Sequence, residues 1–117
     1  MVALSSLPVA AQGGGGGDVR PYDAKLMRLA EILGAVHYLR ERCGANEGQA
    51  WRNRMNELIE GEGSASLRRA QLTSRFNNGY RSYSRTYQTC TPSAQTAIVR
   101  FLAEGAKLSD ELAATSQ

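Results

Sequence analysis

The sequence predicts an all-α protein, a small four-helix bundle with one disulfide bond. Apolar residues recur at helical spacing in four successive segments, and glycine or proline separates these segments. No segment shows the alternation of apolar and polar residues that is typical of a β-strand. The 117 residues have room for one domain, and their 42% hydrophobic and 21% charged content is ordinary for a globular chain. No stretch is apolar enough for a membrane span.

The first predicted helix covers residues 22–42 and has the broadest apolar face of the four. That face consists of residues about one helical turn apart: Tyr22, Leu26, Leu29, Ile32, Leu33, Val36 and Leu39. A helix with so wide an apolar face is expected to lie at the centre of the bundle and to touch more than one neighbour. Gly44 follows it and provides the left-handed residue that often ends a helix.

The second predicted helix covers residues 47–59. Asn46 and Gln49 fit a capping box, in which each side chain satisfies a backbone N–H at the helix start. Gly61 and Gly63 are expected to end the helix. Its apolar side contains Trp51, Met55, Leu58 and Ile59.

The third predicted helix starts at Ser64 or Ser66, either of which is a possible cap, and runs to about Thr89. Gly79 lies beside its apolar stripe, where the absence of a side chain is expected to let another helix approach closely. The stripe is a narrow and mostly aromatic arc that contains Leu72, Phe76, Tyr80, Tyr83, Tyr87 and Cys90.

The fourth predicted helix begins at Pro92, with Thr91 as its cap, because a capping hydroxyl followed by proline is a strong start signal. It is expected to fray before Gln117. Gly105 marks another expected close approach. The residues that this helix is expected to bury are Ala94, Ile98, Phe101, Leu108 and Leu112.

Cys43 and Cys90 each stand where a predicted helix stops. We expect them to form a disulfide that links the first helix to the junction of the third and fourth, which would stabilise the fold by about 4 kcal/mol in the loop-entropy model. A disulfide predicts an oxidising compartment outside the cytoplasm. The alternative is a cytosolic protein with two free thiols. Two cysteines and one histidine make an incomplete ligand set, so neither a metal nor another cofactor is expected.

Residues 1–20 are predicted to be a signal-peptide remnant and flexible glycine-rich tail, ahead of a helical domain in residues 21–117. The uncharged residues 1–12 contain small residues that fit signal peptidase cleavage after Ala11, and residues 13–17 are all glycine. A positively charged start is missing, so we interpret this segment as the end of a signal peptide that begins upstream. The alternative is a disordered N-terminal tail.

Charge is unevenly distributed along the chain. The formal net charge is +3, and no acidic residue lies between Gly63 and Ala103, a stretch that contains six arginines. Just before it stand Glu57, Glu60 and Glu62. This pattern predicts one basic helix and one acidic corner. The three glutamates lie at a glycine-rich helix end, so we expect a solvated surface there and not an acid/base pair of the kind that glycosidases use.

His37 is the candidate catalytic residue. A catalytic histidine needs a nucleophile or an orienting carboxylate, and Glu41 is one turn away, but no nucleophile is identifiable. The alternative is a histidine packed in the core. The sequence therefore favours a role in binding over one in catalysis.

Arg81 and Arg85 lie opposite the tyrosines of the third helix. Nucleic-acid binding would require aromatic residues and arginines on one surface, so no nucleic-acid partner is expected. The two arginines are instead candidates for contact with an acidic partner, or form a merely solvated face. Trp51 and Arg52 complete the candidate binding surface, since tryptophan and arginine dominate interface centres when they are exposed; burial of Trp51 is the alternative.

A series of short motifs runs through the chain after the glycine run: Arg20-Pro21-Tyr22-Asp23, His37-Tyr38-Leu39-Arg40, Cys43-Gly44-Ala45-Asn46-Glu47, Trp51-Arg52, Gly79-Tyr80-Arg81 and Cys90-Thr91-Pro92. With these motifs the chain resembles a small secreted alphaproteobacterial family that is catalogued only as a domain of unknown function. The resemblance implies a signal peptide and a location outside the cytoplasm, and it carries over no catalytic or binding residue.

These observations lead to the hypothesis of a non-enzymatic periplasmic protein that binds an envelope protein or an anionic envelope component. The alternative hypothesis is a cell-wall hydrolase or lyase that uses His37 and a carboxylate.

Overall fold

The computed structural model describes residues 23–61 and 65–115, and within this part the chain forms four α-helices and no strand. They are α2 (Asp23–Arg42), α3 (Ala50–Gly61), α4 (Ser66–Thr86) and α5 (Pro92–Thr115). The predicted all-α fold is confirmed. The predicted signal-peptide remnant and tail in residues 1–20 lie outside the described residues.

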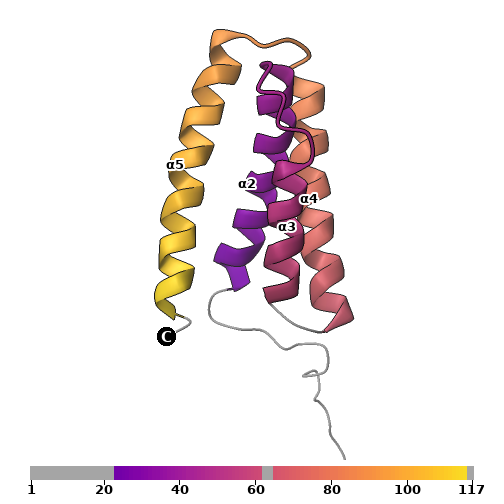
Figure 1. Ribbon diagram of the computed structural model, residues 1–117, viewed down its shortest axis with the longest axis vertical. Coiled ribbons are helices and arrows are strands. Elements are labelled where there is room, and N and C mark those ends of the chain that lie inside the picture. Colours follow the sequence, from indigo (N-terminus) through magenta and orange to yellow (C-terminus); the bar gives the residue numbers. More distant parts are fainter. Residues whose placement is uncertain (1–22, 62–64, 116–117) are drawn as a thin grey trace, which may run out of the picture.

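Helix α2 is the centre of the molecule. It lies between α5 on one side and α3 and α4 on the other, and it packs against all three (Figure 1). Half of its 20 residues are buried, which confirms the broad apolar face expected from the sequence. Because a helix that is apolar around much of its circumference must be covered on several sides, the other helices surround α2.

The core consists of two clusters along α2. One lies between α2 and α5, where Val36 and Leu39 pack with Ile98 and Phe101. The other joins α2 to α3 and α4 through the buried residues Leu26, Ala30, Met55, Leu72 and Phe76. Each large apolar side chain in these clusters contributes about 1.5–3 kcal/mol by its removal from water.

Two glycines set the distance between α2 and α4. A Cβ on Gly79 would clash with the backbone carbonyl of Glu31, and a Cβ on Gly34 would clash with that of Phe76. The predicted close approach at Gly79 is confirmed, and Gly34 is its counterpart on α2. A Cβ on Gly105 would lie 3.5 Å from a methyl group of Ile32, which is ordinary contact, so the predicted close approach of α5 there is wrong.

The start of α3 differs from the prediction. The helix begins at Ala50 and not at residue 47, because Asn46 and Gly48 have φ values of +54° and +59°, which lie in the left-handed region. A residue with left-handed φ does not have the extended backbone of an N-cap, so the predicted capping box of Asn46 and Gln49 is wrong. The helix ends at Gly61, as expected; Gly63 lies outside the described residues.

The ends of α4 also correct the prediction. Its N-cap is Ala65, without a capping side chain, so Ser66 is not the cap; Ser64 lies outside the described residues. The helix ends at Thr86 and not near Thr89, because Tyr87 is extended and its carbonyl accepts a hydrogen bond from the Tyr38 hydroxyl. That bond anchors the end of α4 to α2.

The connection between α4 and α5 is tied to the end of α2. Cys43 and Cys90, which are 47 positions apart in sequence, form the predicted disulfide, with their Cα atoms 4.9 Å apart. Gly44 has a φ of +86°, which confirms the predicted helix end. The Ala94 amide donates to the Thr91 hydroxyl at 3.1 Å, which confirms the predicted cap of α5. Among the described helices, none is long and apolar enough to cross a membrane.

Candidate functional site

Trp51 lies in the first turn of α3, next to the connection from α2. Its indole N–H donates to Glu47 at 2.6 Å, and Arg40 forms two hydrogen bonds to the same carboxylate at 2.9 and 2.5 Å. The Arg40 guanidinium, with a second contribution from Trp51, lowers the pKa of Glu47 to about 2. Arg54 also lies over the indole ring, 5.5 Å from its centre. Half-buried and engaged in this way, Trp51 has a structural role in holding the α2–α3 connection.

The other three candidate residues lie on α3 and α4. The Arg52 guanidinium lies 4.9 Å over the ring of Phe76 and thereby joins the two helices. Arg81 and Arg85 are exposed on α4, and Arg81 donates to the Asn78 side chain at 2.9 Å. The structure therefore gives the four residues three different surroundings and does not gather them into one cluster.

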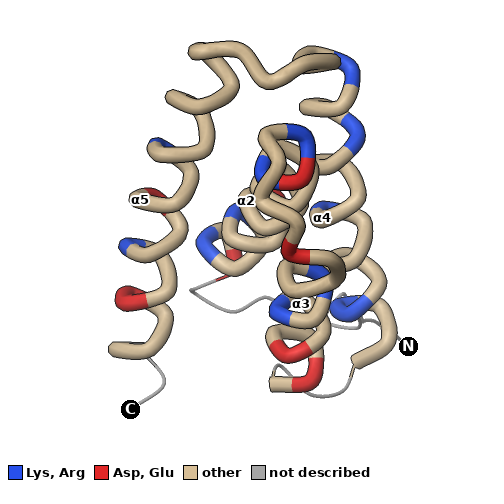
Figure 2. The backbone as a smooth tube through the Cα atoms, turned by 45° about the horizontal axis from the view of Figure 1, so that its top comes forward, with Lys and Arg blue, Asp and Glu red and all other residues tan. Residues whose placement is uncertain are grey.

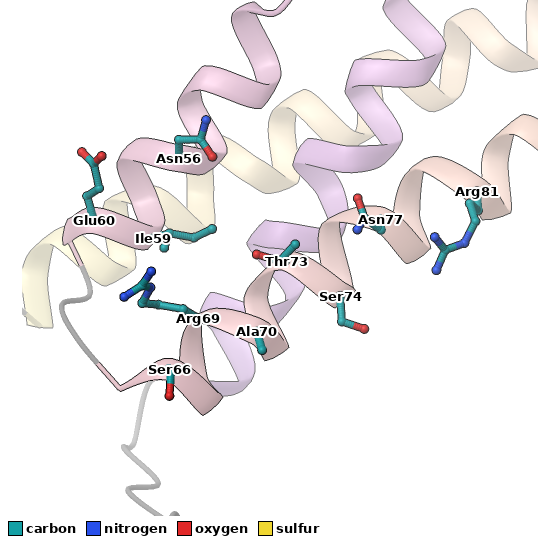
Figure 3. A pocket seen from close by; sticks show the side chains of 10 residues that line it. All are labelled: Asn56, Ile59, Glu60, Ser66, Arg69, Ala70, Thr73, Ser74, Asn77 and Arg81. Atoms are coloured by element: carbon teal, nitrogen blue, oxygen red, sulfur yellow. The ribbon is translucent and has the colours of Figure 1, made fainter.

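Arg81 lines a groove of about 1100 Å³, which we call the α3/α4 groove (Figure 3). At its other end Arg69 reaches from α4 toward α3, near Ile59. Two guanidinium groups and one carboxylate, that of Glu60, border the groove, and most of the remaining lining is hydroxyl or amide. The full lining is Asn56, Ile59 and Glu60 from α3 and Ser66, Arg69, Ala70, Thr73, Ser74, Asn77 and Arg81 from α4.

The charge around this groove is polarised in the way the sequence predicts. Basic residues recur along α4, whereas the acidic residues of α3, both glutamates, lie toward its C-terminal end (Figure 2). The acidic end includes the exposed residues Glu57 and Glu60; Glu62 lies outside the described residues. The groove is therefore most cationic at its Arg81 end. Guanidinium groups recognise carboxylates and phosphates through paired hydrogen bonds.

A second groove lies on the opposite face of α4, where the sequence analysis placed only core tyrosines. Two adjoining cavities of about 500 and 290 Å³ share Arg28, Tyr83, Tyr87 and Phe101. Because they share these residues, we treat them as one site, the α4/α5 groove. The rest of its lining is Glu31, Ala35, Gly79, Ser82, Thr86, Ala97, Arg100 and Glu104.

Three aromatic rings form the wall of the α4/α5 groove. The rings of Tyr83 and Tyr87 are parallel to within 3°, with their centres 6.2 Å apart. Tyr83 also meets Phe101 edge to face, with a centre-to-centre distance of 5.1 Å and an angle of 88°. Both tyrosines are half-buried, so their rings contact the core and the groove.

Arg28 holds the polar side of the same groove. Its guanidinium donates to both carboxylate oxygens of Glu104, at 2.8 and 3.0 Å, and to Glu31 at 3.0 Å. These contacts, led by the hydrogen bonds to Glu104, raise the pKa of Arg28, and the guanidinium in turn lowers the pKa of Glu104. Arg28 also lies over Phe101, 5.7 Å from the ring centre. The charged groups are thus fixed relative to the rings.

A model of the DUF2385 family, described as a protein of unknown function, matches residues 21–115. The chain belongs to the DUF2385 family. The match spans all four described helices. Neither the curated proteins nor the solved structures include a match. The family description gives no activity, so a function for this DUF2385 chain has to be argued from its own residues.

His37 of the DUF2385 chain is a core residue. The residue is 6% exposed, and its ring packs with its centre 5.5 Å from that of Tyr80 and 6.0 Å from that of Phe76. Burial is the main cause that lowers its pKa, with Arg52 adding to the effect and Glu41 opposing it. A general base has to reach its substrate, so this arrangement gives no support to the hydrolase hypothesis. No group of three potential metal ligands occurs within residues 23–61 and 65–115.

Proposed function

We propose that this protein acts in the periplasm by binding, and not by catalysis, and that its α3/α4 groove holds an anionic polymer of the cell envelope. The observation that carries the proposal is the presence of Arg69 and Arg81 in one polar groove of about 1100 Å³. The Cys43–Cys90 disulfide supports the location, since disulfides persist in compartments outside the cytoplasm.

The spacing of the two arginines favours an extended ligand. Arg69 and Arg81 are twelve positions apart on one helix, which corresponds to about 18 Å at a rise of about 1.5 Å per residue. Their guanidinium groups can each pair with a carboxylate or phosphate of the same polymer. Between them, the hydroxyls and amides of Thr73, Ser74 and Asn77 can bond to neutral polar groups such as sugar hydroxyls.

Two further candidate residues from the sequence, Arg85 and Arg52, lie close to the α3/α4 groove. Arg85 follows Arg81 by one helical turn and extends the basic track beyond the groove. Arg52, on α3, covers Phe76 next to the groove residue Asn77. The basic residues along this side of α4 are therefore expected to act together on a chain of anionic groups.

Binding to purified peptidoglycan sacculi, whose stem peptides carry carboxylates, tests the proposal by co-sedimentation. We expect the unaltered protein to sediment with sacculi and to be released as salt rises, because exposed charge pairs are screened. The double variant Arg69→Gln/Arg81→Gln should bind about tenfold more weakly, through loss of two charge-assisted contacts.

The matched control is Arg42→Gln/Arg75→Gln, which removes two exposed positive charges outside the groove. It should keep most of the binding. Equal losses in both double variants would show only a general effect of net charge and would overturn the assignment of the groove. Vesicles with anionic phospholipid serve as the comparison arm, and binding to vesicles alone would contradict the proposal.

A further inference from the structure

Aromatic rings border the α4/α5 groove in a fixed arrangement. Tyr83 and Tyr87 are one helical turn apart, their rings are parallel, and both border the groove. The face of an aromatic ring carries partial negative charge, and C–H groups of a ligand can pack against it favourably. A flat ligand ring with C–H groups on one face fits such a wall.

The charges around the groove balance. Its basic residues are Arg28 and Arg100 and its acidic residues are Glu31 and Glu104, so two positive charges offset two negative ones. A balanced site does not favour a charged ligand by long-range attraction. The same groups supply fixed hydrogen-bond donors and acceptors, and the hydroxyls of Ser82 and Thr86 border the groove as well.

A ligand cation is a poor candidate for this site, although aromatic cages bind cations in other proteins. The position over Phe101 already holds the Arg28 guanidinium, and that guanidinium already pairs with both carboxylates. What the lining offers is aromatic rings for C–H groups together with hydrogen-bonding partners for hydroxyls.

The groove is also held in place before any ligand binds. The carbonyl of Tyr87 accepts the hydrogen bond from Tyr38, and the disulfide at Cys90 lies three residues farther along the chain. Tyr83 is fixed by its contact with Phe101. Groups that are ordered in advance lose little entropy on binding. The two adjoining cavities, of about 500 and 290 Å³, together fall in the size range of ligand sites, roughly 300–1000 Å³.

From these observations we infer that the α4/α5 groove is a second binding site, which takes an uncharged sugar ring of a glycan. The C–H face of the sugar packs on the tyrosine wall formed by Tyr83 and Tyr87. Its hydroxyls bond to the guanidinium group of Arg28 and to the carboxylates of Glu31 and Glu104, which Arg28 holds in place. This site is separate from the α3/α4 groove, because the two grooves lie on opposite faces of α4 and share no lining residue.

The test is an NMR titration of the full chain with two neutral probes, chitotetraose and cellotetraose. Saturation transfer from the protein to the sugar C–H protons is expected for at least one probe, with a Kd on the order of 1 mM or below. Backbone amide shifts should map to the C-terminal half of α4 and the facing residues of α5. The absence of transfer and of shifts for both probes at about 10 mM would overturn the inference.

Variants distinguish a role of Tyr83 in binding from a role in folding. Tyr83→Leu should weaken binding about tenfold, whereas Tyr83→Phe, which keeps the ring face, should bind nearly as well as the original chain. If Tyr83→Leu unfolds, Thr86→Arg serves in its place, because Thr86 is exposed and a long side chain there obstructs the groove. Binding that survives a folded Thr86→Arg variant would contradict the site.

The two proposed sites can fail independently. Arg69→Gln/Arg81→Gln should leave the neutral probes bound with unchanged affinity, and Thr86→Arg should leave co-sedimentation with sacculi largely unchanged. If the arginine double variant abolishes binding of the neutral sugars, they bind in the α3/α4 groove, and the inference about the α4/α5 groove is wrong even if the proposed function holds.

Discussion

Helices α4 and α5 both pack against α2, but different chemistry holds each of them. At the α2–α4 crossing the two backbones touch, because Gly34 and Gly79 have no side chains to keep them apart. At the α2–α5 contact, side chains such as Ile98 and Phe101 fill the space, and Arg28 forms an ion pair with Glu104. Contact between backbones fixes a helix closely, whereas contact through side chains leaves a wider spacing. The α4/α5 groove lies beside this second contact and is lined by residues of α2, α4 and α5.

The covalent bond is expected to matter most on the α5 side. Replacing both cysteines, Cys43→Ser/Cys90→Ser, should lower the free energy of unfolding by about 4 kcal/mol, because the unfolded chain regains the freedom of a long loop. Urea denaturation of the variant, and of the original chain with and without reductant, measures this loss. Hydrogen exchange should show α5 opening before α4. Equal protection of the two helices would contradict the comparison.

The two types of helix contact predict opposite effects of the same substitution. Gly79→Ala should destabilise the fold by about 2–3 kcal/mol, since the new Cβ would clash with the Glu31 carbonyl on a neighbouring backbone that has little room to move. Gly105→Ala is the matched control on α5. Its Cβ would lie 3.5 Å from Ile32 and 3.8 Å from Leu29, so the better helix propensity of alanine should raise stability by up to about 1 kcal/mol. Both are measured by chemical denaturation, and shifts of the same sign would show that the two interfaces do not differ.

Much of this fold follows from local pattern. The wide apolar face of α2 predicts its central position, and the positions of Cys43 and Cys90 at helix ends predict the disulfide. The close contact at Gly34 could not be predicted in this way, because a glycine within an apolar face looks like any small core residue. Only the partner helix shows that its missing side chain is essential. The late start of α3 could not be predicted either, since Asn46 is compatible with both a helix cap and a left-handed turn.

The candidate sites are harder to predict, because a groove is a property of two helices. The sequence placed Arg81 on an exposed face, and the structure places it there, in the α3/α4 groove. It placed Tyr83 and Tyr87 on an apolar face, and both do contact the core. That these tyrosines also border a groove depends on how far α5 stands from α4. The periodicity of a single helix carries no information on that distance.

The ion pair between α2 and α5 is expected to contribute less than either the disulfide or the glycine contact. Arg28→Gln should cost about 0.5–1 kcal/mol, because the side chain is 42% exposed and solvent weakens its pairing with Glu104. Denaturation measurements at low and high salt check this, with a smaller difference from the original chain at high salt. Lys25→Gln, which removes a single and longer contact to Glu111 at 3.2 Å, is the control and should have a smaller effect. A larger loss for Lys25→Gln would contradict this ranking.

The smallest expected effects are changes in the free energy of unfolding with pH. They occur in different pH ranges for the α2–α4 and the α2–α5 interface. On the α2–α4 side, burial lowers the pKa of His37 from its usual 6.5. The unfolded chain therefore takes up a proton at a higher pH than the folded one, and the stability due to neutral His37 is lost as pH falls below about 6.5. In the His37→Gln variant, the free energy of unfolding should no longer decrease with falling pH in this range.

On the α2–α5 side, hydrogen bonds from Arg28 lower the pKa of Glu104 from its usual 4.5. Its contribution is present above that pH and is lost only as pH falls below it, because the unfolded carboxyl is protonated first. Acidification should therefore weaken the α4 contact before the α5 contact, with Glu104→Gln flattening only the lower part of the curve. Unfolding free energies measured between pH 8 and pH 3 test this order. If Glu104→Gln removes the slope near pH 6, or His37→Gln leaves it unchanged, the order is wrong, and pH does not distinguish the packing of α4 from that of α5.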